Sequence, residues 1–331
     1  MKHTRILALF AVALLLFGCT GCKIPFLEDL MGAQNLIPAR VNFVVTVKVA
    51  DLYNDPDFQS QLQKSGMQEI DELKEEYGID ISQVSKMIVF GDSSAMSNYY
   101  SPFGSFQQAY AGALVYAPFN EAEIVSKLKA DGDVTEDTYE GFTLYTSGSS
   151  SSPSATAFID GKVIVSGSVQ AVKDVISVKV GKAQPLSNAD MDVVSANVNS
   201  NALFTAVAVV PSDLRTDLRK QSQGPMSAQA FSNVDTAGLS VNKAGDSVEI
   251  RVAFLCDDPA GAEKVGDLIG GTAKMAKGMV QSGSAAETLL DAVEVSTSGS
   301  LTFVKLDTTK RVLEDVQSEL GGLSQMMTPY S

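Results

Sequence analysis

The chain has 331 residues, of which 45% are hydrophobic and 19% are charged, and its formal net charge is −14 at pH 7. This composition is ordinary for a folded globular protein, and the length allows more than one hydrophobic core. The acidic excess disfavours nucleic acid and anionic lipid headgroups, because both carry negative charge. We therefore expect no nucleic-acid partner.

The first 18 residues have the pattern of an export signal. Lys2 and Arg5 supply positive charge, and an apolar run follows from Ile6 to Phe17. A run of this length matches the apolar region of a signal peptide and is shorter than the ~20 residues that cross a bilayer as a helix. We predict that residues 1–18 are removed, which leaves 23 basic and 39 acidic residues and a net charge of −16.

Two cysteines, Cys19 and Cys22, follow this run directly. The segment from Leu14 to Cys22 resembles the lipobox of bacterial lipoproteins, in which an aliphatic residue, a small residue and Gly or Ala precede the lipidated cysteine. Cys19 fits with Leu and Gly in place and a bulky Phe as the departure; the alternative, Cys22, has a cysteine at the aliphatic position. The resemblance implies lipidation at Cys19, or at Cys22, and a location in the cell envelope at the outer face of a membrane. Two or three acyl chains on one cysteine anchor a protein stably.

Beyond the signal, one local pattern recurs along the chain. A strand rich in β-branched residues leads into a tight turn with Asp, Asn or Pro, and the turn opens an amphipathic helix. Asp55 and Asp258 are expected to cap such helices, since each precedes a proline at the first helical position. Turn residues also predict three hairpins, with turns at Asp160-Gly161, at Ser298-Gly299, and in a longer loop containing Asn242 and Gly245.

Hairpins require antiparallel pairing, so we expect an α+β fold with antiparallel sheets and helices packed on one face. Residues 19–39 are interpreted as a lipidated N-terminus and tether. The folded body is divided into an N-terminal lobe at 40–198 and a C-terminal lobe at 199–331, two lobes of similar plan. Internal duplication is a hypothesis that rests on this layout, because the residues themselves do not repeat.

Histidine is missing from the mature chain, since the only His is His3 and lies in the signal. The segment from Ile88 to Ser93 resembles the nucleophile block of GDSL-type esterases, but those enzymes need a His base to activate the serine. Ser126 and Lys129 match a bare S-x-x-K spacing without the other motifs of penicillin-binding enzymes. We therefore predict that the protein is not an enzyme.

No motif in the chain indicates a metal ion or a cofactor. The acidic segment from Asp131 to Glu140 fails the EF-hand pattern and is interpreted as an exposed turn. The segment from Gly266 to Gly271 lies within a predicted helix and lacks phosphate-binding spacing, so close helix packing accounts for it better. We expect neither a metal site nor a bound cofactor.

Three features bear on binding. Aromatic side chains gather in a polar loop, which predicts a partner-binding site or, alternatively, a hairpin whose rings fold onto the sheet; they are Tyr99, Tyr100, Phe103 and Phe106. Met275 and Met279 have the spacing of a core stripe, with a Met-lined ligand groove as the alternative. Cys256 ends an apolar run and is expected to be buried.

A second resemblance is to uncharacterised envelope lipoproteins. It is carried by the segment from Ile37 to Arg40, the strand Val44–Val49, Asp51-Leu52, and a strand from Tyr139 to Tyr145. No activity can be carried over from that group. We predict a non-catalytic, lipid-anchored envelope protein with a binding or scaffolding role, whose partners are the membrane through covalent lipid and a protein or apolar ligand. The alternative is a carrier that holds an apolar ligand or lipid between sheet and helices.

Overall fold

A computed structural model describes residues 36–64, 78–92, 110–148, 153–220 and 228–326. The fold is α+β, and the strands pair in antiparallel fashion. The described chain divides into two compact units, with the boundary between Ala189 and Asp190. The predicted boundary lies after residue 198. In the structure α8 (Ala189–Asn197) instead belongs almost wholly to the second unit.

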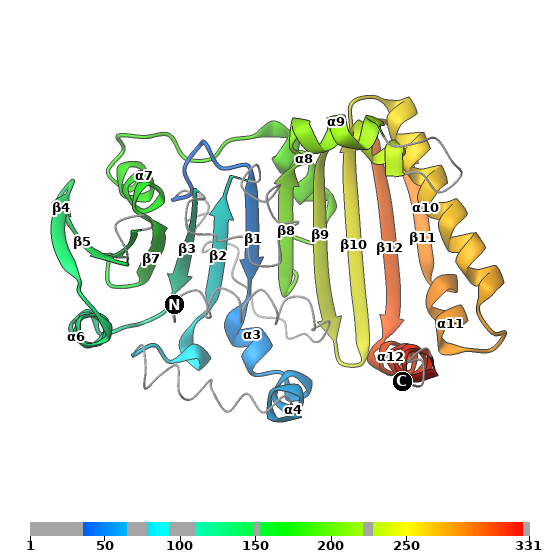
Figure 1. The fold of residues 1–331 in the computed structure, drawn as a ribbon, viewed down its shortest axis with the longest axis horizontal. Coiled ribbons are helices and arrows are strands. Elements are labelled where there is room, and N and C mark those ends of the chain that lie inside the picture. The colour runs from blue at the N-terminus through cyan, green and yellow to red at the C-terminus, as the bar shows by residue number, and fades with distance from the viewer. Residues whose placement is uncertain (1–35, 65–77, 93–109, 149–152, 221–227, 327–331) are drawn as a thin grey trace, which may run out of the picture. The chain divides into compact units, whose positions relative to one another are not determined.

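The first unit begins with Ile37, which is fully buried, and Pro38, which forms a β-bridge with Pro185. Its elements in chain order are β1 (Phe43–Val47), α3 (Val49–Tyr53), α4 (Pro56–Lys64), η1 (Ile81–Gln83), β2 (Lys86–Gly91), β3 (Ala111–Tyr116), α6 (Glu121–Asp131), β4 (Thr135–Tyr139), β5 (Phe142–Ser147), β6 (Ser154–Ile159), β7 (Val163–Ser168) and α7 (Val169–Lys179). The strands are ordered β1-β2-β3-β7-β6-β5-β4 across the sheet (Figure 1).

Helices cover both faces of this first sheet. Val165 of β7 packs with Val172 of α7 in the main core cluster. The next residue back, Ile164, points to the opposite face, where it packs with Ile124 of α6. The prediction that helices pack on one face is therefore wrong, and the consecutive buried residues Val163, Ile164 and Val165 are the physical reason, since both sides of β7 need cover.

The second unit has a five-stranded sheet among its described residues. Its elements after α8 are β8 (Phe204–Val209), α9 (Ser212–Lys220), η4 (Ala228–Asn233), β9 (Val234–Ala244), β10 (Ser247–Cys256), α10 (Pro259–Met279), α11 (Ala285–Asp291), β11 (Val293–Ser298), β12 (Leu301–Thr309) and α12 (Lys310–Met326). The strand order is β8-β9-β10-β12-β11 (Figure 1).

The predicted helix starts are confirmed at both aspartates. Asp55 Oδ1 accepts hydrogen bonds from the backbone N–H groups of Asp57 and Phe58, each at 3.0 Å. Asp258 Oδ1 accepts from the N–H of Gly261 at 2.6 Å, and Pro259 follows at the first helical position. These bonds satisfy N–H groups that the helix itself leaves without partners.

The hairpins form, but their turns differ in detail from the predictions. Asp160 and Gly161 do adopt positive φ, yet Ile159 pairs with Val163, so Lys162 is an extra residue in the loop. The turn between β11 and β12 is Gly299-Ser300, one residue later than predicted.

Two expected strand boundaries are wrong. Asn242 lies within β9 and pairs with Glu249, so the turn there is the two-residue Gly245-Asp246. The segment from Tyr139 to Tyr145 is a hairpin and not one strand, because Glu140 and Gly141 adopt positive φ and Tyr139 pairs with Phe142. The Glu-Gly pair supplies the backbone conformation that a two-residue turn requires.

A glycine on β9 sets how closely α8 approaches the second sheet. A methyl group at Gly238 would collide with Cγ1 of Val194 and lie 3.4 Å from Cγ1 of Val198, both at the α8 side of the strand. We expect Gly238→Ala to lower the free energy of unfolding by about 1–3 kcal/mol through overpacking, measured by urea denaturation of the purified chain.

The matched control is Gly270→Ala, because the space around Gly270 is open and the residue lies within α10. Its expected effect has the opposite sign, a gain of about 0.5–1 kcal/mol from the lower entropy of the unfolded chain. Equal stability losses in the two variants would contradict close packing of α8 on β9.

Candidate apolar binding face

Burial alternates along β8 and β9, but the chemistry is the reverse of the usual pattern. The buried side carries Val207 beside several hydroxyl residues: Thr205, Thr236 and Ser240 are 8%, 0% and 1% exposed. The partly exposed side of the same strands carries larger apolar residues such as Phe204, Leu239 and Val241. A continuous apolar surface that stays partly exposed indicates a binding site, whereas single exposed apolar residues are common on any protein.

The strand register arranges these apolar residues in two rows across four strands. One row joins Phe204, Val241, Ile250 and Leu306, and the other joins Ala206, Leu239, Val252 and Val304. All eight residues are partly exposed. We call these eight residues the open face. With strands ~4.8 Å apart, each row extends ~15 Å across the sheet.

Buried residues border the open face at one end of the strands, and a half-buried residue packed under α10 borders it at the other. At one end Val248, Lys243 and Thr308 are buried on the same side of the sheet. At the other end Phe254 packs in a cluster with Val265 of α10. Figure 1 shows α9 across one end of β8, β9 and β10 and no labelled helix in front of their middle. The open face is thus a bounded apolar surface in the middle of the sheet.

Two methionines near the C-terminal end of α10 are exposed. Met275 and Met279 are 40% and 75% exposed, so the prediction that they form a core stripe is wrong. At 3.6 residues per turn they lie beside Val265, on the side of the helix away from Gly266. Val265 packs over β9 and β10, and Gly266 faces Thr297 of β11. Figure 1 shows that α10 then runs outward past β11, so the later part of the helix, which carries the methionines, leads away from the open face.

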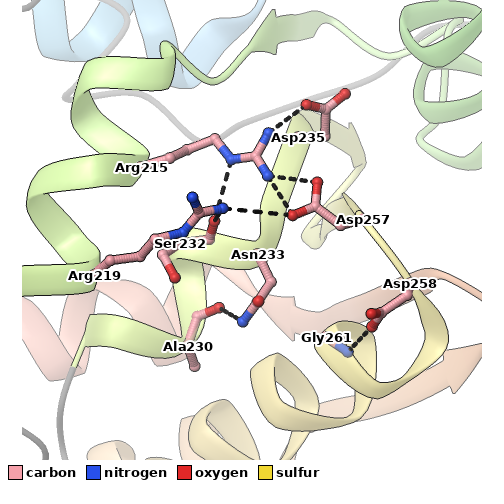
Figure 2. A network of polar contacts seen from close by, with 9 residues as sticks. All are labelled: Arg215, Arg219, Ala230, Ser232, Asn233, Asp235, Asp257, Asp258 and Gly261. Atoms are coloured by element: carbon pink, nitrogen blue, oxygen red, sulfur yellow. Dashed lines mark hydrogen bonds and ion pairs between the residues drawn. The ribbon is translucent and has the colours of Figure 1, made fainter.

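Next to this surface, Arg215 of α9 holds three segments of the second unit together (Figure 2). Its Nε donates to the carbonyl oxygen of Ser232 at 3.1 Å, and its Nη1 donates to Asp235 Oδ1 at 2.6 Å. Its Nη2 donates to both carboxylate oxygens of Asp257. The Arg219 guanidinium adds a longer ion pair to Asp257 at 3.8 Å. We call this network the Arg215 clasp.

The Arg215 clasp holds α9 in place. α9 has no buried residue, and Leu214 is 40% exposed, so apolar packing contributes little to holding this helix. The Arg215 side chain is only 14% exposed, and the planar guanidinium uses its fork of N–H donors on protein acceptors. The clasp therefore fixes α9 to the starts of β9 and α10.

Beneath the clasp lies Cys256, which is 4% exposed and confirms the expected burial. Burial, followed by the negative charges of Asp257 and Asp258, raises the pKa of its thiol to about 11. A thiol with that pKa is almost wholly protonated near neutral pH and is a poor nucleophile.

A second polar cluster lies in the first unit. Tyr110 donates a hydrogen bond to Asp174 at 2.9 Å, and the Arg40 guanidinium stacks 3.9 Å from the Tyr110 ring centroid. Gln170 donates to the other Asp174 oxygen at 2.6 Å. Burial raises the pKa of Tyr110 far above its ordinary value, and the hydrogen bond to the Asp174 carboxylate is the second largest cause. This tyrosine is held protonated, and the cluster fastens the entering chain to α7.

Several predicted site residues lie outside the described residues, namely Cys19, Cys22, Ser93 and the aromatic loop of Tyr99, Tyr100, Phe103 and Phe106. Lys129 forms an ion pair with Glu136 at 2.5 Å, and this partner raises the pKa of its ammonium group, which disfavours its use as a base. Within the described ranges no three His, Cys, Asp or Glu side chains are grouped as metal ligands. The open face was not found from the sequence, although the alternation in β9 from Val234 to Ala244 carries its signal.

Comparisons with known proteins leave the family open. No family model matches the chain, and no curated protein matches it. Crystal forms I, III and IV of TP0453 each align with a TM-score of 0.46, at 9%, 9% and 10% identity. The alignments cover 87%, 86% and 86% of this chain and 96%, 97% and 96% of the TP0453 chain. A likeness of this degree carries no argument about function.

The Arg215 clasp is expected to contribute to the stability of the second unit. Arg215→Ala removes the charged hydrogen bonds and leaves Asp235 and Asp257 without their guanidinium, so we expect a loss of about 2 kcal/mol in the free energy of unfolding, measured by urea denaturation. Arg215→Lys should recover only part of this loss, because an ammonium group cannot reproduce the fork.

Arg311→Ala is the control, since Arg311 is 90% exposed and pairs with Asp315 one turn along α12. Exposed pairs of this kind contribute little to stability. If the two alanine variants lose stability equally, the clasp does not hold α9 in the way described.

Proposed function

We propose that this chain is an exported, non-catalytic envelope protein, lipid-anchored through Cys19, with Cys22 as the alternative, and that its second unit binds an apolar partner. The observation that carries the binding role is the open face, in which eight apolar side chains stay partly exposed while the other side of the same strands buries hydroxyls. Leaving such a surface in water costs free energy that a bound apolar partner recovers.

The anchor is supported by the sequence pattern of residues 1–22. None of the helices in the described residues combines the length and apolar character needed to cross a membrane. Acyl chains on a cysteine provide attachment without a spanning helix.

A non-catalytic role is supported by the chemistry of the polar clusters. The Arg215 guanidinium is bonded to protein acceptors, and the Tyr110 hydroxyl donates to Asp174. The thiol of Cys256 is buried and has a raised pKa. Each cluster is thus committed to holding the fold, and none presents an activated nucleophile to solvent.

The similar plan of the two lobes is supported by strand order. In the first unit β1, β2 and β3 are followed by α6, and β7 returns beside β3 with β6 next to it. In the second unit β8, β9 and β10 are followed by α10, and β12 returns beside β10 with β11 next to it. We infer an internal duplication in which β4 and β5 are additions to the first copy.

The anchor is tested by the intact mass of the chain extracted from membranes of a host that processes lipoproteins. We expect loss of residues 1–18 and added mass corresponding to two or three acyl chains at the new N-terminus. Cys19→Ser should abolish both changes, with Cys22→Ser as the control that keeps them. A full-length, unacylated product would contradict the anchor, and the reverse pattern would assign it to Cys22.

A further inference from the structure

We propose that the open face takes an acyl chain of a lipid from the membrane to which the tether holds the protein. This inference rests on the proposed function, because the anchor tethers the chain to a bilayer. It names the class of ligand as a lipid with an uncharged or zwitterionic headgroup, bound through its hydrocarbon chain.

The floor of the open face fits hydrocarbon. Seven of its residues are aliphatic and the eighth is Phe204, and cross-strand pairing sets them in two continuous rows. No hydroxyl, amide or charge interrupts either row. A protein partner normally meets a polar rim and a few directed hydrogen bonds, whereas an acyl chain needs only continuous apolar contact.

The first unit provides an internal comparison. On the face of its sheet that α6 covers, β6 and β7 carry the partly exposed Thr156 and the exposed Ser166, whose hydroxyls hydrogen bond at 3.1 Å. Strands in the corresponding places of the second unit, β11 and β12, carry Val295 and Val304. Strands that occupy the same place in the order of the two units thus carry polar residues in the first unit and apolar residues in the second.

The tether places lipid within reach. Residues 20–35 separate Cys19 from Leu36, where the described chain begins. At ~3.5 Å per residue the tether spans at most ~60 Å, so membrane lipid is present at high effective concentration. The net charge of −16 after signal removal disfavours anionic headgroups, which is why the headgroup is assigned as uncharged or zwitterionic.

The test uses the full acylated chain in phosphatidylcholine vesicles whose acyl chains carry a photoreactive diazirine. After illumination, cross-linked peptides are mapped by mass spectrometry. We expect cross-links on the open-face residues of β9, β10 and β12. The paired change Val241→Glu with Ile250→Glu should lower this yield by at least about tenfold, because an acyl chain cannot cover a carboxylate without a large desolvation cost.

Val193→Glu is the matched control, because Val193 is an apolar residue 40% exposed on α8. It should leave the yield unchanged. If the paired glutamates prevent folding, Val241→Thr with Ile250→Thr replaces them, since threonine keeps the β-branched shape that suits a strand and still puts hydroxyls on the open face. Circular dichroism and the thermal midpoint confirm that each variant is folded.

Cross-links confined to residues 19–35, or a yield that the open-face variants do not change, overturn the proposal. So does a second polypeptide, whether another copy of this chain or a different protein, that occupies the open face in place of lipid. The unacylated Cys19→Ser chain, used at raised concentration, distinguishes failure of the anchor from failure of lipid binding. Open-face cross-links in that chain would uphold lipid binding and contradict only the anchoring.

Discussion

The two sides of the second sheet are chemically different, and this difference is the constraint on which the account depends. Gly238 lets α8 approach β9 closely, and the hydroxyl of Ser240 accepts a hydrogen bond from the Asn199 N–H at 3.0 Å. That side buries Val207 together with the hydroxyls of Thr205 and Ser240. Larger apolar side chains such as Phe204 and Leu239 lie on the other side, where the described helices border them without covering their middle.

Fixed elements surround this apolar surface. The Arg215 clasp holds α9 at one end of the strands, and Asp258 caps the helix α10 that carries the exposed methionines. Charged hydrogen bonds and caps are directional, so they position a helix even where little apolar area is buried beneath it. The result is a rigid border around an apolar floor, which suits a ligand recognised by its apolar character and not by a fixed pattern of polar groups.

Much of the local structure could be predicted from the sequence. Asp55 and Asp258 begin helices, Cys256 is buried, and positive φ at Asp160 and Gly161 makes a turn, because short-range steric and hydrogen-bonding rules decide each of these.

The features that could not be predicted from the sequence depend on packing between residues far apart in the chain. Helices cover both faces of the first sheet because β7 buries consecutive residues, and Met275 is exposed because α10 packs through Val265 and Ala262. The helical spacing of the methionines is real, but spacing alone does not say which side of a helix meets the sheet. The open face needed the register of four strands, and no local pattern specifies which side of those strands α8 covers.

The central claim is that the open face is an apolar binding surface occupied in the membrane-bound protein. Native mass spectrometry of the chain after gentle extraction tests it most directly. The account predicts a noncovalent lipid bound in addition to the covalent acyl groups, retained in Val193→Glu and lost when Val241 and Ile250 are replaced by glutamate. A folded wild-type chain that carries its acyl groups and no other lipid would contradict it.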